Sequence, residues 1–124
     1  MSLTFYKLMH ILGILLVFLG LGGRAVLAAQ SEPRKAPGQK LVGILHGAGL
    51  LIVLVGGFGM LAKLGLNGEE LQGLGWVLVK MVIWILLGGS IMIPVRKPEW
   101  TTPWLVAVTA LAMVAGYFAF YKPF

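Results

Sequence analysis

The feature that most constrains this chain is the apolar stretch at residues 41–62, LVGILHGAGLLIVLVGGFGMLA, between Lys40 and Lys63. The stretch carries no charge. As an α-helix rising ~1.5 Å per residue it reaches about 33 Å, slightly more than a ~30 Å hydrocarbon core. A segment in lipid must satisfy its own backbone polar groups, and this run lacks the two-residue alternation of a barrel strand. We therefore predict a transmembrane helix.

Three more apolar runs of similar length predict helices over residues 5–27, 75–93 and 103–121. The segments between the runs contain Pro, Gly and charged residues, which are typical of turns. The chain is 59% hydrophobic and 11% charged, whereas an ordinary soluble domain has about 25% charged residues. We predict an all-α integral membrane protein, an up-down-up-down bundle of four transmembrane helices that forms a single transmembrane domain over residues 1–124.

The first run also has features of a secretory signal, because VLA at residues 26–28 resembles a cleavage site. Its apolar stretch is longer than a usual signal core, so we expect the helix to be retained. The positive-inside rule sets the orientation. One side of the predicted bundle carries Arg24, Arg34, Lys35, Lys40, Arg96 and Lys97, and the other side carries Lys7, Lys63 and Lys122. We expect a bacterial inner-membrane protein with both termini outside the cytoplasm.

The charge and composition exclude several classes of function. The net charge of +6 comes from basic residues beside apolar runs, which favours contact with phosphate headgroups of the lipid bilayer over nucleic acid. Trp100 and Trp104 suit an aromatic belt at the membrane interface.

The absence of cysteine excludes a disulfide, a thiolate nucleophile and an iron–sulfur cluster. A transporter with a carboxylate proton relay is disfavoured, because no predicted span contains an acidic residue. A hydrolase is also disfavoured, because no histidine lies at the depth of Ser90 in the predicted bundle.

Two polar residues inside the spans share a depth. His10 and Lys80 each lie five residues from the start of a helix that begins on the terminus side, so both are about 8 Å deep. His46 lies five residues into a helix that begins on the opposite side, which puts the two histidine layers roughly 14 Å apart. Axial ligands of one iron must lie roughly 4 Å apart. We therefore predict that His46 is a packing residue and not a partner of His10.

Met60 and Tyr117 complete the layer of His10 and Lys80 on the terminus side. Helical spacing also places His10 on one stripe with Gly13, Val17, Gly20 and Arg24. An imidazole, a cation and an aromatic ring beside small residues would suit a plate-shaped ligand. Each residue also has a simpler interpretation: Lys80 can snorkel to the interface, His10 can hydrogen-bond a carbonyl, and Met60 can fill the core.

Short motifs along the chain resemble those of a known family. YKLMHI at residues 6–11, GWVLVK at 75–80 and YKPF at 121–124 are similar to landmarks of the small membrane protoporphyrinogen oxidases of the HemJ type. SirB-like and CopD-like membrane proteins are more loosely similar. The resemblance implies a four-helix protein of porphyrin biosynthesis that binds haem b and acts as an oxidoreductase on a porphyrin substrate. Residue by residue, it implies that His10 is the haem ligand and that Lys80 is a catalytic residue, either a ligand or a partner of a substrate carboxylate.

Two hypotheses follow from these observations. The first is a haem b-binding, redox-active membrane protein in which His10 is the metal ligand, Lys80 or Met60 faces the other side of the cofactor, and Tyr117 lies in the same layer. The second is a non-enzymatic accessory subunit that packs on a larger membrane complex or forms a homo-oligomer. Gly43 and Gly47, four residues apart, have the spacing for close helix packing.

Overall fold

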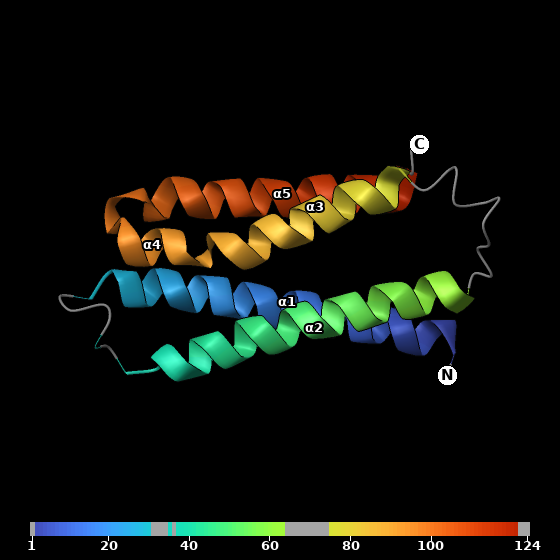
Figure 1. The fold of residues 1–124 in the computed structure, drawn as a ribbon, viewed down its shortest axis with the longest axis horizontal. Helices are drawn as coiled ribbons and strands as arrows, with labels where there is room; N and C mark the ends of the chain where they lie inside the picture. The colour runs from blue at the N-terminus through green and yellow to red at the C-terminus, as the bar shows by residue number, and fades with distance from the viewer. Residues whose placement is uncertain (1, 31–34, 36, 64–74, 122–124) are drawn as a thin grey trace. The chain divides into compact units, whose positions relative to one another are not determined.

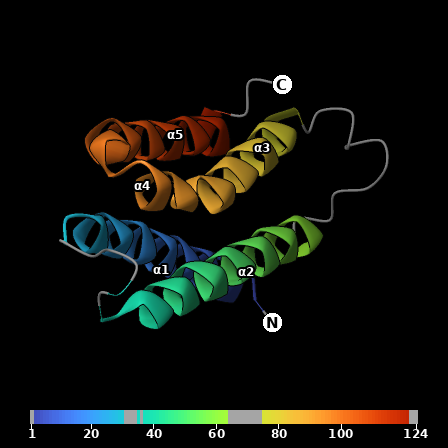
Figure 2. The ribbon, with the colours of Figure 1, turned by 60° about the vertical axis from the view of Figure 1, so that its left-hand side comes forward.

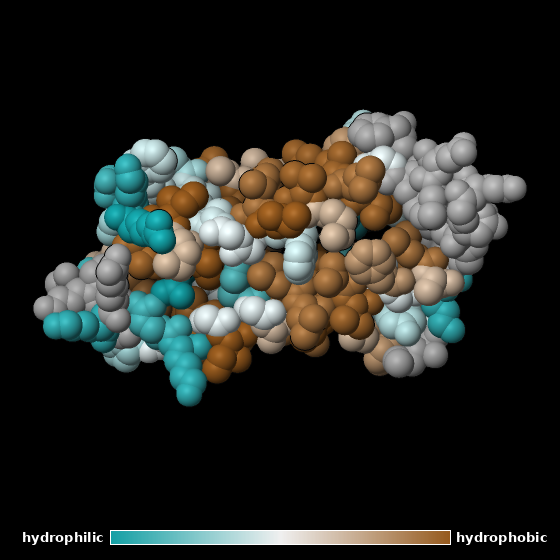
Figure 3. Space-filling model, in the orientation of Figure 1, coloured by the Kyte–Doolittle hydropathy of each residue, from teal (hydrophilic) through white to brown (hydrophobic). Residues whose placement is uncertain are grey.

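The computed structural model describes residues 2–30, 35, 37–63 and 75–121. Four helical segments are long and apolar enough to cross a membrane, namely Leu3–Ala28, Gln39–Lys63, Gly75–Arg96 and Pro98–Tyr121. In the view of Figure 3, apolar side chains cover most of the middle of these helices. Over the described residues, the prediction of an all-α chain with four helices able to span a membrane is confirmed, and these helices are consistent with an integral membrane protein.

The helices group into two compact units, Met1–Leu66 and Asn67–Phe124. The up-down-up-down order and the single transmembrane domain stay predictions. The predicted second loop falls largely on residues 64–74, and the end of the YKPF motif falls on residues 122–124. Both lie outside the described residues.

The first unit is a hairpin of α1 (Leu3–Ala28) and α2 (Gln39–Lys63), which lie side by side in both ribbon views (Figures 1 and 2). Ser2 caps α1, because its Oγ accepts a hydrogen bond of 3.1 Å from the backbone N–H of Phe5. Gly38 precedes α2 with a φ of 95°. Its carbonyl accepts a hydrogen bond of 2.9 Å from the N–H of Val42. The left-handed backbone of Gly38 thus turns the chain into α2 at a position that favours glycine.

Replacing Gly38 with alanine is expected to destabilise the hairpin by about 1–2 kcal/mol, because an L side chain is strained at this positive φ. Thermal or denaturant unfolding in detergent micelles measures the change. Gly22→Ala is the control, because no described residue lies within 4 Å of a methyl group built on Gly22 and its φ is not positive. Equal stability of Gly38→Ala and the parent protein would contradict the prediction.

Glycines let the backbones of α1 and α2 approach closely. A methyl group built on Gly13 would lie 2.6 Å from the backbone nitrogen of Val53, and one on Gly49 would lie 2.6 Å from that of Val17. Real side chains do not tolerate such distances, so no residue larger than glycine fits without a shift. Gly13 and Val17 are buried, as expected of the stripe that contains His10.

The glycines of α2 that meet α1 are not the pair that the sequence spacing suggested. Gly43 and Gly47 are exposed, and no described residue lies within 4 Å of a methyl group built on either one. Gly49 and Gly56 make the close approach instead, because they lie on the side of α2 that faces α1. A spacing of four residues identifies small residues on one face of a helix but does not say which face meets the neighbour.

The second unit contains α3 (Gly75–Gly89), η3 (Ser90–Met92), α4 (Ile93–Arg96), η4 (Pro98–Trp100) and α5 (Thr101–Tyr121). The expected helix end at Pro94 is wrong, because the helical path continues to Arg96. Pro94 lies in the first turn of α4, where a residue without an N–H costs no helical hydrogen bond.

Trp104 differs from its expected place in an aromatic belt. The residue is 5% exposed, and its Nε1–H donates a hydrogen bond of 3.0 Å to Ser90 Oγ. This bond joins the beginning of α5 to the end of the α3–η3 segment and satisfies both polar groups within the second unit. Trp100 is exposed, and its place at the membrane interface stays a prediction.

Candidate functional site

His10 is held in place by the backbone of α2. A methyl group built on Gly56 would lie 2.9 Å from the backbone nitrogen of His10, so the glycine lets the histidine approach closely. The Nδ1 atom of His10 lies 2.9 Å from the carbonyl oxygen of Val53. Because a carbonyl oxygen only accepts hydrogen bonds, Nδ1 carries the proton and donates it. In the neutral ring, the lone pair is therefore on Nε2, the atom that would bind a metal.

A second glycine, Gly57, borders the ring of His10. A methyl group built on Gly57 would lie 3.5 Å from Cε1 and 3.7 Å from Nδ1 of the imidazole. Both residues are half-buried. Met60 lies three residues beyond Gly57 on α2 and is also half-buried. The hairpin thus brings His10 and Met60 to the same end, as the depth argument predicts.

His46 lies at the other end of the hairpin. A methyl group built on Gly20 would lie 2.8 Å from Cβ of His46, and the histidine is 5% exposed. His10 faces Gly56, ten residues further along α2 than His46, which corresponds to about 15 Å along the helix axis. The hairpin therefore keeps the two histidines in separate layers, and they cannot ligate one iron.

Lys80 and Tyr117 belong to the second unit. The Nζ atom of Lys80 lies 6.0 Å from the centre of the Trp76 ring, one turn earlier on α3, at the outer limit of a cation–π contact. The ring of Tyr117 lies 4.8 Å from that of Tyr121 on α5, and Tyr117 is 52% exposed. The structure describes these two residues within their own unit, so the four-residue layer with His10 and Met60 stays a prediction.

Arg24, the last member of the predicted stripe, has a partner at the loop end of the hairpin. Its Nη1 donates a hydrogen bond to Oε1 of Gln39, the first residue of α2. The side chain joins the last turns of α1 to the beginning of α2. Its role in the hairpin is therefore structural.

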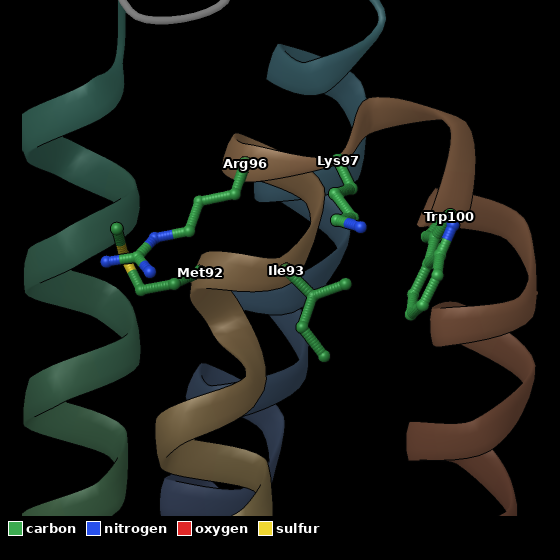
Figure 4. Close-up of a pocket in the computed structure, with 5 residues that line it drawn as sticks. All are labelled: Met92, Ile93, Arg96, Lys97 and Trp100. Atoms are coloured by element: carbon green, nitrogen blue, oxygen red, sulfur yellow. The ribbon is translucent and has the colours of Figure 1, made fainter.

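An open groove of about 310 Å³ lies at the turn between α4 and η4 (Figure 4). The Nζ atom of Lys97 lies 4.8 Å from the centre of the Trp100 ring, and cations beside a tryptophan are typical of the membrane interface. The groove is lined by Met92, Ile93, Arg96, Lys97 and Trp100. Sequence reasoning placed these cations at the headgroups but did not find the groove.

Among the residues that the structure describes, no group of three or more His, Cys, Asp or Glu side chains could hold a metal ion. Haem iron needs fewer protein ligands, because the porphyrin nitrogens supply its equatorial ligands. No family model, curated protein or solved structure matches the chain.

Proposed function

We propose that the protein is an integral membrane haem b protein in which Nε2 of His10 ligates the iron. The hydrogen bond from Nδ1–H of His10 to the Val53 carbonyl carries this proposal. Ligating histidines usually donate their other ring N–H to a carbonyl or carboxylate, which fixes the tautomer and the orientation of the ring. The close approach of Gly56 to the backbone of His10 and the place of Gly57 beside the ring add to this orientation.

The remaining residues of the predicted layer have defined roles in this proposal. Lys80 either ligates as a neutral amine or pairs with a carboxylate of the haem or of a porphyrin substrate, and Met60 offers a thioether from α2. Tyr117 supplies an aromatic wall. This arrangement requires the four spans to cross the bilayer up-down-up-down, with both termini on the non-cytoplasmic side of a bacterial inner membrane. Bound haem would supply one-electron redox chemistry.

Redox activity is part of the proposed function, whereas the protoporphyrinogen oxidase reaction is implied only by the resemblance to the HemJ-type family. The HemJ-type family usually has a tryptophan in the middle of the first helix and a histidine shortly after it. This chain has Val17 and Gln30 at the corresponding places. Val17 packs against Gly49 in the hairpin, so the centre of α1 serves helix packing. Haem binding through His10 requires neither of the two missing residues.

Absorbance of the purified protein tests the proposal. The protein is purified in mild detergent, with and without added haemin, and haem is quantified as its pyridine complex. A Soret band with a stoichiometric haem content is expected. A protein that stays colourless after haemin is added and free haemin is removed would refute haem binding.

A second candidate function is a non-enzymatic subunit of a larger membrane complex or homo-oligomer. The exposed glycine face of Gly43 and Gly47 favours it, because a helix from another chain can approach such a face closely. Native electrophoresis of the parent protein and of Gly47→Leu distinguishes the two functions. A colourless protein whose native complex is lost in Gly47→Leu would support the accessory role, whereas a coloured protein with an unchanged native size would refute it.

A further inference from the structure

The two helices of the hairpin repeat one sequence motif. Residues 10–23 and 46–59, offset by 36, both have the pattern H-x-x-G-x-L-x-V-x-x-G-x-x-G. In the pattern, His10 corresponds to His46, Gly13 to Gly49, Leu15 to Leu51, Val17 to Val53, Gly20 to Gly56 and Gly23 to Gly59.

The three-dimensional contacts follow the same correspondence. A methyl group on Gly13 would lie 2.6 Å from the Val53 nitrogen and 2.9 Å from the Gly49 oxygen. A methyl group on Gly49 would lie 2.6 Å from the Val17 nitrogen and 2.9 Å from the Gly13 oxygen. Exchanging α1 with α2 thus reproduces the contacts, so the antiparallel hairpin has a local pseudo-two-fold axis.

The histidines obey this symmetry as well. Gly56 faces His10, with 2.9 Å from its built methyl group to the histidine nitrogen, and Gly20 faces His46 with 3.0 Å to the equivalent atom. The two imidazoles therefore begin from equivalent backbone positions, one near each end of the hairpin. Any difference between them comes from the residues that border the rings.

One pair of equivalent positions breaks the symmetry beside the rings. Gly57 borders the edge of the His10 ring that contains Cε1 and Nδ1. The equivalent position on α1 is Leu21, which is 0% exposed. His10 is half-buried, whereas His46 is 5% exposed. The smaller residue, Gly57, thus lies beside the more exposed ring, that of His10.

We propose that Gly57 keeps the His10 imidazole accessible to a planar ligand and that Leu21 closes the equivalent site at His46. The inference rests on the proposed function for the identity of the ligand, but the difference in access does not depend on it. A leucine at position 57 would extend from a Cβ already 3.5 Å from Cε1 and 3.7 Å from Nδ1, and would therefore narrow the space beside the ring. This explains why one of two equivalent histidines serves as a site.

Chemical modification of the histidines tests access without haem. The chain contains two histidines, so diethyl pyrocarbonate, which reacts with neutral imidazole, can be followed at each one by mass spectrometry of peptides. In the parent protein in micelles, His10 is expected to react several-fold faster than His46. Equal rates at the two histidines would overturn the proposal.

Single substitutions at these positions make the test more specific. Gly57→Leu is expected to slow modification of His10 several-fold and leave His46 unchanged. Gly57→Ala is expected to have little effect, because its methyl group lies at an ordinary contact distance from the ring. Gly43→Leu is the matched control, because it adds the same side chain to an exposed site on the same helix. If Gly57→Leu does not fold, Leu21→Ala tests the other copy and should raise the reactivity of His46.

Haem titration of the same variants connects access with function. In a parent protein that binds haem, Gly57→Leu should lower haem affinity several-fold and Gly43→Leu should not. A folded Gly57→Leu variant with unchanged haem affinity and unchanged His10 reactivity would refute the role of Gly57. A parent protein that binds no haem but shows the expected reactivities would refute the proposed function and support the difference in access.

Discussion

Gly49→Ala is expected to separate α1 from α2 and to cost the hairpin about 3 kcal/mol or more, the upper range for overpacking a close interface. The new methyl group would lie 2.6 Å from the Val17 nitrogen and 2.9 Å from the Gly13 oxygen. Both are backbone atoms, so the clash cannot be relieved by rotating a side chain. In a membrane the helices themselves should persist, because their backbone hydrogen bonds are internal.

Gly47→Ala is the matched control for this prediction. Gly47 is on the same helix, but no described residue lies within 4 Å of a methyl group built on it. Alanine favours a helix over glycine by ~1 kcal/mol in water, so the control should be neutral or slightly stabilising. Intrinsic propensity acts in the same direction at both positions. Destabilisation at residue 49 alone therefore isolates the packing clash.

Spin labels can measure the separation of the helices, because the chain has no native cysteine. Leu15 and Leu51 are exposed residues at corresponding positions of the two helices, and cysteines there accept a pair of labels. The interspin distance should lengthen or broaden in Gly49→Ala and stay unchanged in Gly47→Ala. An unchanged interspin distance and an unchanged melting temperature in Gly49→Ala would show that α1 and α2 are not in close contact.

Hydropathy alone predicted the four apolar helices, because length and low charge determine which segments can enter lipid. The predicted spans at 5–27 and 41–62 lie within α1 and α2, which extend beyond them by one or two residues at each end. The predicted end of the third helical segment at Pro94 was wrong, because a proline is tolerated in the first turn of the short helix that follows. The predicted place of Trp104 in an aromatic belt was wrong. Hydropathy cannot distinguish an interfacial tryptophan from one that packs and hydrogen-bonds inside a unit.

The sequence predicted part of the residue arrangement around His10, and the rest depended on the register of the two helices. The stripe from His10 through Gly13 and Val17 was correctly expected to lie on one face, since that follows from helical periodicity within one segment. Gly57 was missed, because its importance depends on which residue of α1 it faces. The motif that α1 and α2 share at an offset of 36 residues indicates which residues face each other. Two helices with the same motif can pair about a two-fold axis, which places Gly56 and Gly57 opposite His10.

His10→Ala is expected to abolish haem binding or to lower haem affinity by more than about 100-fold. Loss of an outer-shell partner of a ligating histidine typically costs about 10–100-fold, so removal of the ligand itself should cost more. Absorbance and the pyridine complex measure the loss. His46→Ala is the control, because His46 is about 15 Å from His10 along the helix axis. This control should lower stability but keep the haem spectrum.

Lys80→Met then tests the predicted meeting of His10 and Lys80. A lysine inside a span costs up to about 3 kcal/mol on insertion scales, so it must snorkel or find a compensating partner. If Lys80 ligates the iron, Lys80→Met should change the spin-state spectrum. If Lys80 pairs with a carboxylate, the variant should keep the spectrum and lose porphyrin affinity. Variants of both residues that fold and retain the parent spectrum and porphyrin affinity would rule out the assignment and leave the accessory-subunit function in its place.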